Sequence, residues 1–401
     1  VPRTLPGPTQ ATMSESELAL LGHLIGDGCT LPRHAIQYTT HELALAEVVA
    51  KLATDVFGAA VTPRIVQERQ WYQVYLSSSQ RLTHGKRNPV ACWLDGMGVF
   101  GLRSHEKHVP TCVFAQPATG IARFLRHLWA TDGCIHLSEN GRHHPQVYYA
   151  SSSAELARNA QSLLLRLGIN AALDCAPQTG KGRHQYHVKV TGKAELERFI
   201  MHVGALGRSK VLRQDRITAH LAMRQANTNR DVLPPQVWQL IAIPAMQAAG
   251  VTTRRMQAGL GNAYCGSTIY KSNLSRERAA RLATVVASEH LARLAASDAY
   301  WDEIVSIEPG GDEEVYDLTV DQLHNFIASD MTVHNSIEQD ADVVLFLYRD
   351  KIYNPDTEKE HIADLIVAKH RNGPTGQISL FFNETQTRFV DLAPNKSGVG
   401  L

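Results

Sequence analysis

The chain has 401 residues, of which 44% are hydrophobic and 20% charged, and a formal net charge of +1. Its length and apolar content predict two or three packed domains and exclude a chain that is disordered overall, while the balanced charge confines any contact with a polyanion to local patches. The six cysteines show no CxxC spacing, and neither a signal peptide nor a long apolar span is present, so we expect a reducing, cytoplasmic compartment and no membrane partner.

Residues 1–13 have the composition of a linker. They include the run Val-Pro-Arg-Thr-Leu-Pro-Gly-Pro and begin without an initiator methionine. Proline and glycine at this density disfavour helices and strands. We therefore expect residues 1–13 to be a linker taken from a longer protein.

A first helix is predicted from Ser14 onward. Ser14 is an N-cap, Glu17 completes a capping box three residues later, and an apolar run follows. The helix is expected to end at Gly26-Asp27-Gly28, with its last glycine in the left-handed cap conformation. The glycines at positions 22 and 26 would let this helix approach a partner helix closely.

This helix and the segments after it recur as a weak internal repeat. Residues 121–131 form a second helical run, which ends at Asp132-Gly133. After each run come a cysteine, an extended segment, a helix beginning with Glu-Leu-Ala and further strand-like segments. The two helices that begin with Glu-Leu-Ala close at Phe57-Gly58 and Leu167-Gly168. The repeat predicts two similar α/β halves related by a pseudo-twofold axis.

Both of the repeated helices end in an aspartate. A carboxylate at a helix C-terminus meets the negative end of the helix dipole, which costs roughly 0.3 to 1 kcal/mol unless a cation compensates. Two such ends side by side would form a divalent-metal site, with Mg²⁺ between Asp27 and Asp132 and water activated against a phosphodiester on each strand of a duplex. The alternative is a pair of amphipathic helices with solvated aspartates, and the repeated context favours the metal site.

The run Leu21-Gly22-His23-Leu24-Ile25-Gly26-Asp27-Gly28 resembles the motif of the LAGLIDADG homing endonucleases that interrupt many inteins. The resemblance implies two αββαββα-like halves over residues 14–205, catalytic and metal-binding roles for Asp27 and Asp132, Mg²⁺ as cofactor, and double-stranded DNA at the empty insertion site as partner. The second copy departs from the family at His127 and Thr131, where small residues are usual. This departure concerns the tightness of helix packing more than the metal site.

Residues 101–110, between the two helices, contain Lys107 and Pro110 and resemble the lysine-proline motif of the same family. By this resemblance Lys107 is a catalytic basic residue, which would orient water or stabilise charge on the phosphate. Without the resemblance, a single lysine in a loop is expected to be merely solvated.

The segment after the second half is basic and is predicted to be helical. Helix starts are predicted at residues 251–257 and 275–283, on either side of a Gly259-Leu260-Gly261 turn. Residues 206–298 are therefore expected to form a basic helical DNA-binding extension, with a spacing suggestive of a helix-turn-helix. A helical linker with a solvated basic face explains the same pattern equally well. The basic residues of the preceding stretch are Arg208, Lys210, Arg213, Arg216, Arg224 and Arg230.

The sequence Val333-His334-Asn335-Ser336 brings three reactive side chains together. The Asn335 amide can attack its own carbonyl carbon to form a succinimide, while His334 protonates the departing amine. The Ser336 hydroxyl can accept an acyl group before that step. These residues predict a peptide bond that breaks after Asn335, although an isolated tripeptide of this kind is usually a polar turn.

The upstream residues favour the reactive interpretation. Residues 315–328 and the junction resemble the C-terminal splicing motifs of inteins, with Tyr-Asp-Leu, His-Asn-Phe and Val-His-Asn in the same order. By position, Asp317 and His324 join His334, Asn335 and Ser336 as catalytic residues. The resemblance implies that residues 299–335 are C-terminal β strands of a Hint-type splicing domain, which needs no cofactor. The Cys or Ser start of inteins is absent, so we expect C-terminal cleavage as the most that the chain does alone.

Residues 336–401 have a different sequence pattern from the segment before them. They contain an apolar strand over 342–348 and two strands over 363–382 around an Asn-Gly-Pro-Thr-Gly turn. This segment resembles the C-terminal end of the RecA-like motor domain of DnaB-family replicative helicases, in which Lys369 and Arg371 would contact the nucleotide of a neighbouring subunit. The resemblance implies ATP with Mg²⁺ and a helicase hexamer, although the chain contains no GxxxxGK[ST] loop.

Taken together, the sequence predicts a mixed α/β (α+β) chain, a truncated precursor of a replicative helicase that carries most of an intein. Its expected activities are C-terminal asparagine cyclisation and site-specific DNA cleavage. The alternative is a DNA-binding protein whose endonuclease has decayed and whose only activity is splicing or C-terminal cleavage. The expected partners are duplex DNA, the missing N-terminal intein and helicase segments, and a helicase hexamer after splicing.

Overall fold

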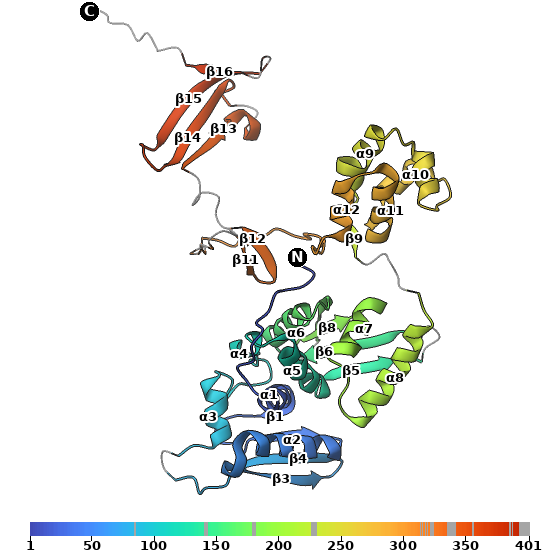
Figure 1. The fold of residues 1–401 in the computed structure, drawn as a ribbon. Coiled ribbons are helices and arrows are strands. Elements are labelled where there is room, and N and C mark those ends of the chain that lie inside the picture. Colours follow the sequence, from blue (N-terminus) through green and yellow to red (C-terminus); the bar gives the residue numbers. More distant parts are fainter. Residues whose placement is uncertain are drawn as a thin grey trace, which may run out of the picture. The chain divides into compact units, whose positions relative to one another are not determined.

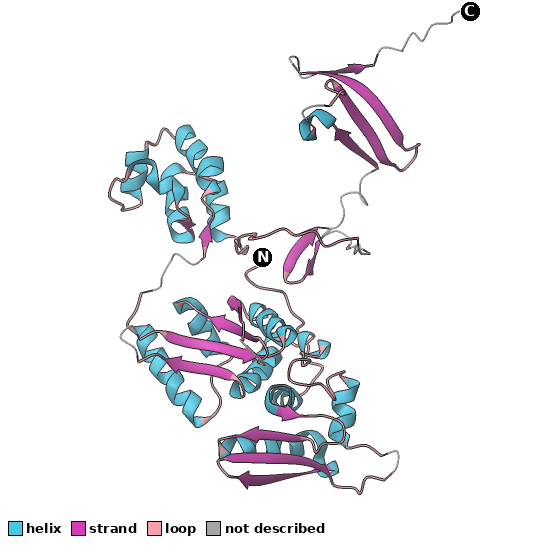
Figure 2. Cartoon of the chain, turned by 180° about the vertical axis from the view of Figure 1, so that it is seen from behind, coloured by secondary structure: helices cyan, strands magenta, loops and turns pink. Residues whose placement is uncertain are grey.

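The computed structural model (Figure 1) describes two compact units, Val1–Ile304 and Val305–Leu401. Helices and strands alternate through the first of them up to residue 202 (Figure 2), so the chain is mixed α/β as predicted. The described residues are 1–83, 86–139, 143–178, 182–225, 231–312, 314, 316, 318, 320, 325–334, 342–354, 357–384, 386 and 388–392.

The first half of the larger unit is a four-stranded antiparallel sheet with strand order β1-β2-β4-β3 and helices packed on it. The predicted capping box starts its first helix, because the Ser14 side chain accepts from the Glu17 N–H and the Glu17 carboxylate accepts from the Ser14 N–H. The elements are α1 (Glu15–Asp27), β1 (Gly28–Cys29), β2 (Gln37–Thr40), α2 (Leu43–Phe57), η1 (Gly58–Ala60), β3 (Val61–Glu68), β4 (Trp71–Ser78) and α3 (Pro89–Gly96).

The second half repeats this αββαββα order, with the strand order β5-β6-β8-β7. A short helix, α4 (Thr111–Phe114), precedes it, and α8 (Arg208–Ala222) follows it. Ile217 and Leu221 of α8 are buried in the same apolar core as the sheets and helices of both halves. The elements of the repeat are α5 (Ala118–Ala130), β5 (Gly133–Leu137), β6 (Pro145–Ser151), α6 (Ala154–Arg166), β7 (Ala171–Ala176), β8 (Gln185–Val190) and α7 (Lys193–His202).

Helices α1 and α5 pack closely against each other, as the glycines predicted. A Cβ atom at Gly22 would lie 2.7 Å from the Phe124 carbonyl oxygen, and one at Gly26 would lie 2.6 Å from the Thr131 Cβ. The larger residues of the second copy therefore face glycines of the first. The departure from the motif at Thr131 does not loosen the interface, because α1 supplies the missing space.

The glycine after each aspartate does not adopt the predicted left-handed cap. Gly28 has φ −78° and ψ 137°, which is extended backbone, and Gly133 is the first residue of β5. Glycine is required here by space, since a Cβ would come within 2.7 Å of the Leu24 Cα at Gly28 and within 2.6 Å of the Trp129 ring at Gly133. Helix α1 thus passes directly into β1, and only Thr131 and Asp132 separate α5 from β5.

Residues 231–297, called here the helical module, have a hydrophobic core of their own around Trp238, Met256 and Leu282. The two predicted helix starts are confirmed, with Thr252 and Ser275 as N-caps whose side chains accept backbone N–H groups. The elements are β9 (Val232–Leu233), η2 (Trp238–Ala242), α9 (Ile243–Ala248), α10 (Thr253–Gly259), η3 (Gly266–Lys271), β10 (Leu274–Ser275), α11 (Arg276–Val286) and α12 (Glu289–Ala296).

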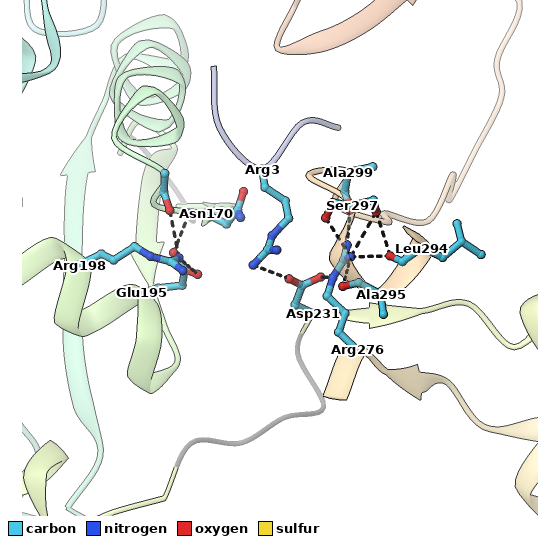
Figure 3. Close-up of polar contacts among 11 residues, drawn as sticks. Arg3, Asn170, Glu195, Arg198, Asp231, Arg276, Leu294, Ala295, Ser297 and Ala299 are labelled. Atoms are coloured by element: carbon cyan, nitrogen blue, oxygen red, sulfur yellow. Dashed lines mark hydrogen bonds and ion pairs between the residues drawn. The ribbon is translucent and has the colours of Figure 1, made fainter. Parts of the chain in front are cut away.

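The first residues of the chain contact the end of the helical module. Pro2 and Ala299 form an antiparallel bridge, and the Arg3 guanidinium lies 3.0 Å from Asp231. Arg276 binds the other oxygen of Asp231 and also donates to carbonyl oxygens at the end of α12 (Figure 3). A single carboxylate therefore connects the N-terminal segment to the core of the helical module.

The second unit contains a hairpin and a four-stranded antiparallel sheet, with the order β13-β14-β15-β16. The predicted strand and the hairpin around the Asn-Gly-Pro-Thr-Gly turn are confirmed as β13, β14 and β15. Among the described residues, no helix is long and apolar enough to span a membrane. The elements are β11 (Asn325–Ala328), β12 (Met331–His334), β13 (Val343–Tyr348), α14 (Asp350–Tyr353), β14 (Ile362–His370), β15 (Gly376–Asn383) and β16 (Arg388–Asp391).

Candidate active site

Asp27 and Asp132 stand at the C-terminal ends of the two packed helices. Asp27 is the last residue of α1, and Asp132 follows the C-cap Thr131 of α5. Both residues reach solvent, but protein atoms surround much of each carboxyl group. Burial and then repulsion from Asp132 raise the pKa of Asp27 to about 6, and burial raises the pKa of Asp132. The structure therefore brings the two predicted carboxylates within electrostatic range of each other.

Lys107 lies beneath the end of α1. Its Nζ donates to the carbonyl oxygens of Gly26 at 2.8 Å and Gly28 at 3.0 Å. Burial lowers the pKa of Lys107, while the two aspartates oppose that shift. The lysine thus places a cation at the negative end of the α1 dipole, and it compensates the carboxylate that ends this helix.

Lys210, which the sequence placed only in a basic run, does the same for α5. Its Nζ donates to the carbonyl oxygens of Trp129 at 2.7 Å, Ala130 at 2.8 Å and Thr131 at 2.9 Å. Burial lowers the pKa of Lys210 to about 8 against the attraction of the aspartates. Lys107 follows Asp27 by 80 residues, and Lys210 follows Asp132 by 78. An alignment of the two repeats would therefore have placed Lys210 opposite Lys107 and identified Lys210 as a candidate site residue.

A cavity of about 260 Å³ opens beside Lys107 and Asp132. Its lining combines the end of α1 with the second sheet, so charged and hydroxyl groups of both halves face one space. Among its lining residues are Gly26, Lys107, Asp132, Tyr149, Ser151 and Gln185.

The two aspartates fit a divalent cation. Repulsion from Asp132 contributes to the raised pKa of Asp27, and a bound cation would remove this cost of ionising Asp27. Within the described part of the chain, no group of three or more His, Cys, Asp or Glu residues could hold a metal. Mg²⁺ needs only one or two protein carboxylates when water and phosphate oxygens complete its coordination, so this donor set suits Mg²⁺ bound together with a phosphodiester.

One face of each sheet carries polar side chains that alternate with the buried ones. In the first sheet, the Tyr75 hydroxyl lies 2.6 Å from Gln73 Oε1, Gln73 Nε2 donates to Glu68 at 3.0 Å, and the Arg64 guanidinium lies over the Tyr75 ring. In the second sheet, the alternation with buried Val147 and Val188 places a comparable set on one face: His136, Gln146, Tyr148, His187 and Lys189. Both faces thus offer hydrogen-bonding groups.

Of the predicted splicing residues, the structure places His334. It ends β12 and pairs with Asn325 at the start of β11. Asp317, His324, Asn335 and Ser336 lie outside the described residues. Residues 301–312, where strands were expected, form no helix or strand.

Lys369 and Arg371 lie at one end of the sheet of the second unit. Lys369 belongs to β14 and pairs with Val344 of β13. Arg371 follows β14 directly, and its guanidinium lies 2.9 Å from the Asp342 carboxylate. Both members of this ion pair are more than half exposed, so the pair contributes roughly 0 to 1 kcal/mol to stability and leaves the arginine accessible to a ligand.

Two family models match this chain. Residues 119–204 match the LAGLIDADG-like domain, and residues 320–391 match the DnaB-like helicase C terminal domain. The chain joins a LAGLIDADG-like domain to a DnaB-like helicase domain. The match to the LAGLIDADG-like domain includes Asp132, and the match to the helicase domain includes Lys369 and Arg371.

Relatives of the helicase family match this chain over two different extents. The replicative DNA helicases DnaB of Nostoc sp. and Synechocystis sp. are 58% and 55% identical over 98% of this chain, which spans 45% of each. The DnaB helicase of Geobacillus stearothermophilus is 52% identical over only 64 residues, or 16% of this chain and 14% of that protein. The chain therefore spans less than half the length of these relatives.

Among solved structures, a crystal structure of I-DmoI in complex with DNA and Mn is similar over 48% of this chain and 98% of that chain, with 12% identity and a TM-score of 0.35.

Proposed function

We propose that the LAGLIDADG-like domain is a Mg²⁺-dependent endonuclease that cuts both strands of duplex DNA at the empty insertion site of its own coding sequence. The observation that carries this proposal is the pair of helix ends. Each end presents one solvent-reaching aspartate, and each has one lysine bound to the carbonyl oxygens of its last turn. Two equivalent half-sites suit a duplex, whose two strands offer two equivalent phosphodiester bonds.

The four charged groups have separate roles in this proposal. Asp27 and Asp132 hold the cation, which when bound lowers the pKa of water and stabilises charge on the phosphate. Lys107 and Lys210 keep positive charge beside the carboxylates and the reacting phosphate. Lys210, with a pKa of about 8, is mostly protonated at neutral pH and still able to exchange its proton.

The sheets would supply the DNA contacts. Their polar faces carry arginine, glutamine, tyrosine, histidine and lysine side chains, which bond to base edges and phosphates in a groove. We propose a pseudo-twofold axis between the halves, because they share element order and strand order. Since the buried face of α8 belongs to the same core and α8 supplies Lys210, we place the end of the endonuclease after α8, near residue 222, and not at residue 205.

We further propose that residues up to Asn335 are an intein inserted in the helicase. The contrast between relatives supports this, since some match the whole chain and others only about 64 residues of it. The antiparallel bridge between Pro2 and Ala299 brings together the two ends of residues 2–299, which suits a domain inserted within the splicing domain of the intein. In this proposal His334 and His324 assist cyclisation of Asn335, Asp317 positions the exchange, and Ser336 is the acyl acceptor.

Residues 336–401 would then belong to the helicase of the host. In the assembled hexamer, Arg371 and Lys369 would stabilise the charge of ATP bound by a neighbouring subunit. The accessible position of Arg371 after β14 supports this assignment.

The endonuclease proposal is tested with Asp27→Asn and Asp132→Asn. Each variant loses one carboxylate ligand, so we expect the cutting of a plasmid that carries the uninterrupted helicase gene to fall at least about 100-fold in the presence of Mg²⁺. DNA binding should remain, because neither change removes a cation. Linear and nicked products are measured separately on gels.

Asp55→Asn is the matched control, because Asp55 is exposed on α2. This variant should cut like the parent protein. Equal cutting by the Asp27 and Asp132 variants contradicts the proposed site. Binding without any cutting by the parent protein supports the decayed endonuclease instead.

The intein proposal is tested by mass spectrometry of the incubated chain. We expect release of a peptide that begins at Ser336, its loss in Asn335→Ala, and release about 100-fold slower in His334→Ala, because the leaving amine then has no proton donor. His290→Ala, on α12, serves as the control histidine change. A parent chain that stays intact, both alone and mixed with the corresponding upstream segment of the Nostoc relative, contradicts the proposal.

A further inference from the structure

The helical module presents a stretch of sequence with cations and no acids. No aspartate or glutamate occurs between Asp231 and Glu277. Arg254, Arg255 and Lys271 within this stretch are all exposed. Local charge here is therefore positive, although the whole chain is nearly neutral, and such a patch attracts a polyanion.

The α-helix α10 and the six-residue 3-10 helix η3 carry these cations and are joined by the loop of residues 260–265, an order of elements that resembles a helix-turn-helix. Gly261 has a φ of +73°, which favours glycine, and it reverses the chain after α10. Gln257 is fully buried and holds the turn, because its side chain donates to the Gly266 carbonyl oxygen at 2.7 Å and accepts from the Cys265 N–H at 2.8 Å. The turn is thus built into the core of the helical module.

One side of η3 is anchored in that core. Ile269 is buried, the Tyr270 hydroxyl lies 2.8 Å from the Thr253 Oγ1, and the Tyr270 ring packs against Trp238. These contacts hold the short helix rigidly against α10 and η2. They leave the other side of η3 exposed, with a row of small polar and cationic residues: Ser267, Thr268 and Lys271.

An arginine and an aromatic ring extend this exposed surface. The Arg254 guanidinium lies over the ring of Tyr264, 5.0 Å from its centroid, and Tyr264 is 58% exposed. Stacking on a ring holds a guanidinium in place while its N–H donors remain available to phosphate oxygens. The surface includes no large aliphatic side chain, which distinguishes it from a membrane anchor.

We propose that this surface, the α10–η3 face, binds duplex DNA and adds a second contact region to that of the LAGLIDADG-like domain. Helix-turn-helix proteins place their second helix in the major groove, where the Ser267 and Thr268 hydroxyls would reach base edges. Arg254, Arg255 and Lys271 would bind the flanking phosphates. The biological use of this face rests on the proposed endonuclease function, which it would assist by lengthening the recognised site.

The test measures DNA binding by a chain that cannot cut. Asp27→Asn and Asp132→Asn are combined in the full chain, and fluorescence anisotropy follows a labelled duplex of mixed sequence at several salt concentrations. Adding Arg254→Ala, Arg255→Ala and Lys271→Ala should weaken binding at least about tenfold at low salt. The slope of log affinity against log salt should fall by about 2 to 3, at roughly 0.9 for each lost phosphate contact.

The matched control removes three other cations from the helical module, with Arg278→Ala, Arg281→Ala and Arg293→Ala. All three are exposed on α11 and α12, so net charge changes equally. This variant should bind within about twofold of its parent, since direct phosphate contacts and not net charge set the salt slope. Circular dichroism and thermal unfolding confirm that both variants are folded.

Three outcomes overturn the proposal: unchanged binding in the α10–η3 variant, equal loss in both variants, or tighter binding to single-stranded DNA or RNA of the same sequence. Failure of the endonuclease gives a different result. In that case the parent protein does not cut, while the loss of binding in the α10–η3 variant persists.

Discussion

At the scale of single residues, the candidate active site depends on four groups that set one another's charge. The raised pKa of Asp27 means that its favourable contribution to metal-free folding is present below pH 3.8 and is lost as pH rises through about 6. A cation bound at neutral pH would restore that contribution. Lys107 and Lys210 already restore part of it, because they lie beneath the same helix ends.

A buried histidine pair shifts stability in the opposite direction. His23 and His127 are 0% and 4% exposed, and His23 Nε2 lies 2.9 Å from His127 Nδ1 across the α1–α5 interface. Burial is the largest cause of the lowered pKa of both histidines. The charges of His127 and Lys210 lower the pKa of His23 further. The charges of Arg123 and Arg126 act in the same way on His127, whose pKa falls to about 4. Both histidines are therefore neutral in the folded protein near pH 7.

We predict that the replacement His127→Gln flattens the pH dependence of stability in acid. A histidine with a lowered pKa binds its proton only after unfolding, so folding free energy is intact above pH 6.5 and is lost as pH falls toward about 4. The part due to His127 is on the order of 3 kcal/mol. Urea unfolding at pH 7.5 and pH 4.5 measures the difference between parent and variant.

The exposed histidine of α12, changed by His290→Gln, provides the control for that experiment. Its variant should lose as much stability between the two pH values as the parent protein. A His127→Gln variant that behaves in the same way would show that the buried pair is protonated in the folded state.

At the scale of elements, the site depends on how closely α1 and α5 approach. Neither helix has a lysine or arginine in its last turn, so the cations that compensate their dipoles come from other elements, the loop before α4 and the first turn of α8. A shift of one helix along the other would separate the aspartates. The glycines of α1 at this contact let the two helices approach closely, with their aspartate-bearing ends near each other.

We expect Gly22→Ala to destabilise the α1–α5 interface by about 1 to 3 kcal/mol, because the new methyl group would overlap the backbone of α5. Mg²⁺-dependent cutting should fall with it, since the aspartates move apart. Gly96→Ala is the matched control, because Gly96 is also helical and a methyl group there would meet no neighbouring element within 4 Å. Chemical denaturation measures the free energy of unfolding of both variants. If the Gly22→Ala variant is as stable as the Gly96→Ala variant, the α1–α5 interface accommodates the methyl group and the prediction is wrong.

At the scale of the whole molecule, the larger unit contains two separate hydrophobic cores. One spans both α/β halves together with α8, and the other belongs to the helical module. Arg276 connects several parts of the helical module. Its side chain is only 11% exposed, binds Asp231 at 2.6 Å, and donates to the Leu294, Ala295 and Ser297 carbonyl oxygens at the end of α12.

We predict that Arg276→Ala destabilises the helical module by about 3 kcal/mol, because it removes a mostly buried ion pair and one donor from each of the carbonyl oxygens at the end of α12. Calorimetry should show at least two unfolding transitions, of which the variant lowers only the one that belongs to the helical module. Arg293→Ala, an exposed change on α12, should shift neither by more than about 0.5 kcal/mol. One cooperative transition for the whole unit would contradict independent cores.

Local sequence determined the repeated order of elements, the capping box at Ser14, the helix starts after Thr252 and Ser275, and the two aspartates. It also contains the triplet His334-Asn335-Ser336, for which cleavage after Asn335 stays a prediction. Each of these depends on side chains within a few residues of one another, where capping, periodicity and turn chemistry act.

Tertiary structure alone decided the partners of Lys210, the His23–His127 pair, the Arg276 network, and the reason for glycine at positions 28 and 133. The Lys210 and histidine contacts join residues that are 79 to 104 positions apart in the chain. No local periodicity or propensity encodes such a distance, because it is set by how two helices and the elements beneath them pack into one core.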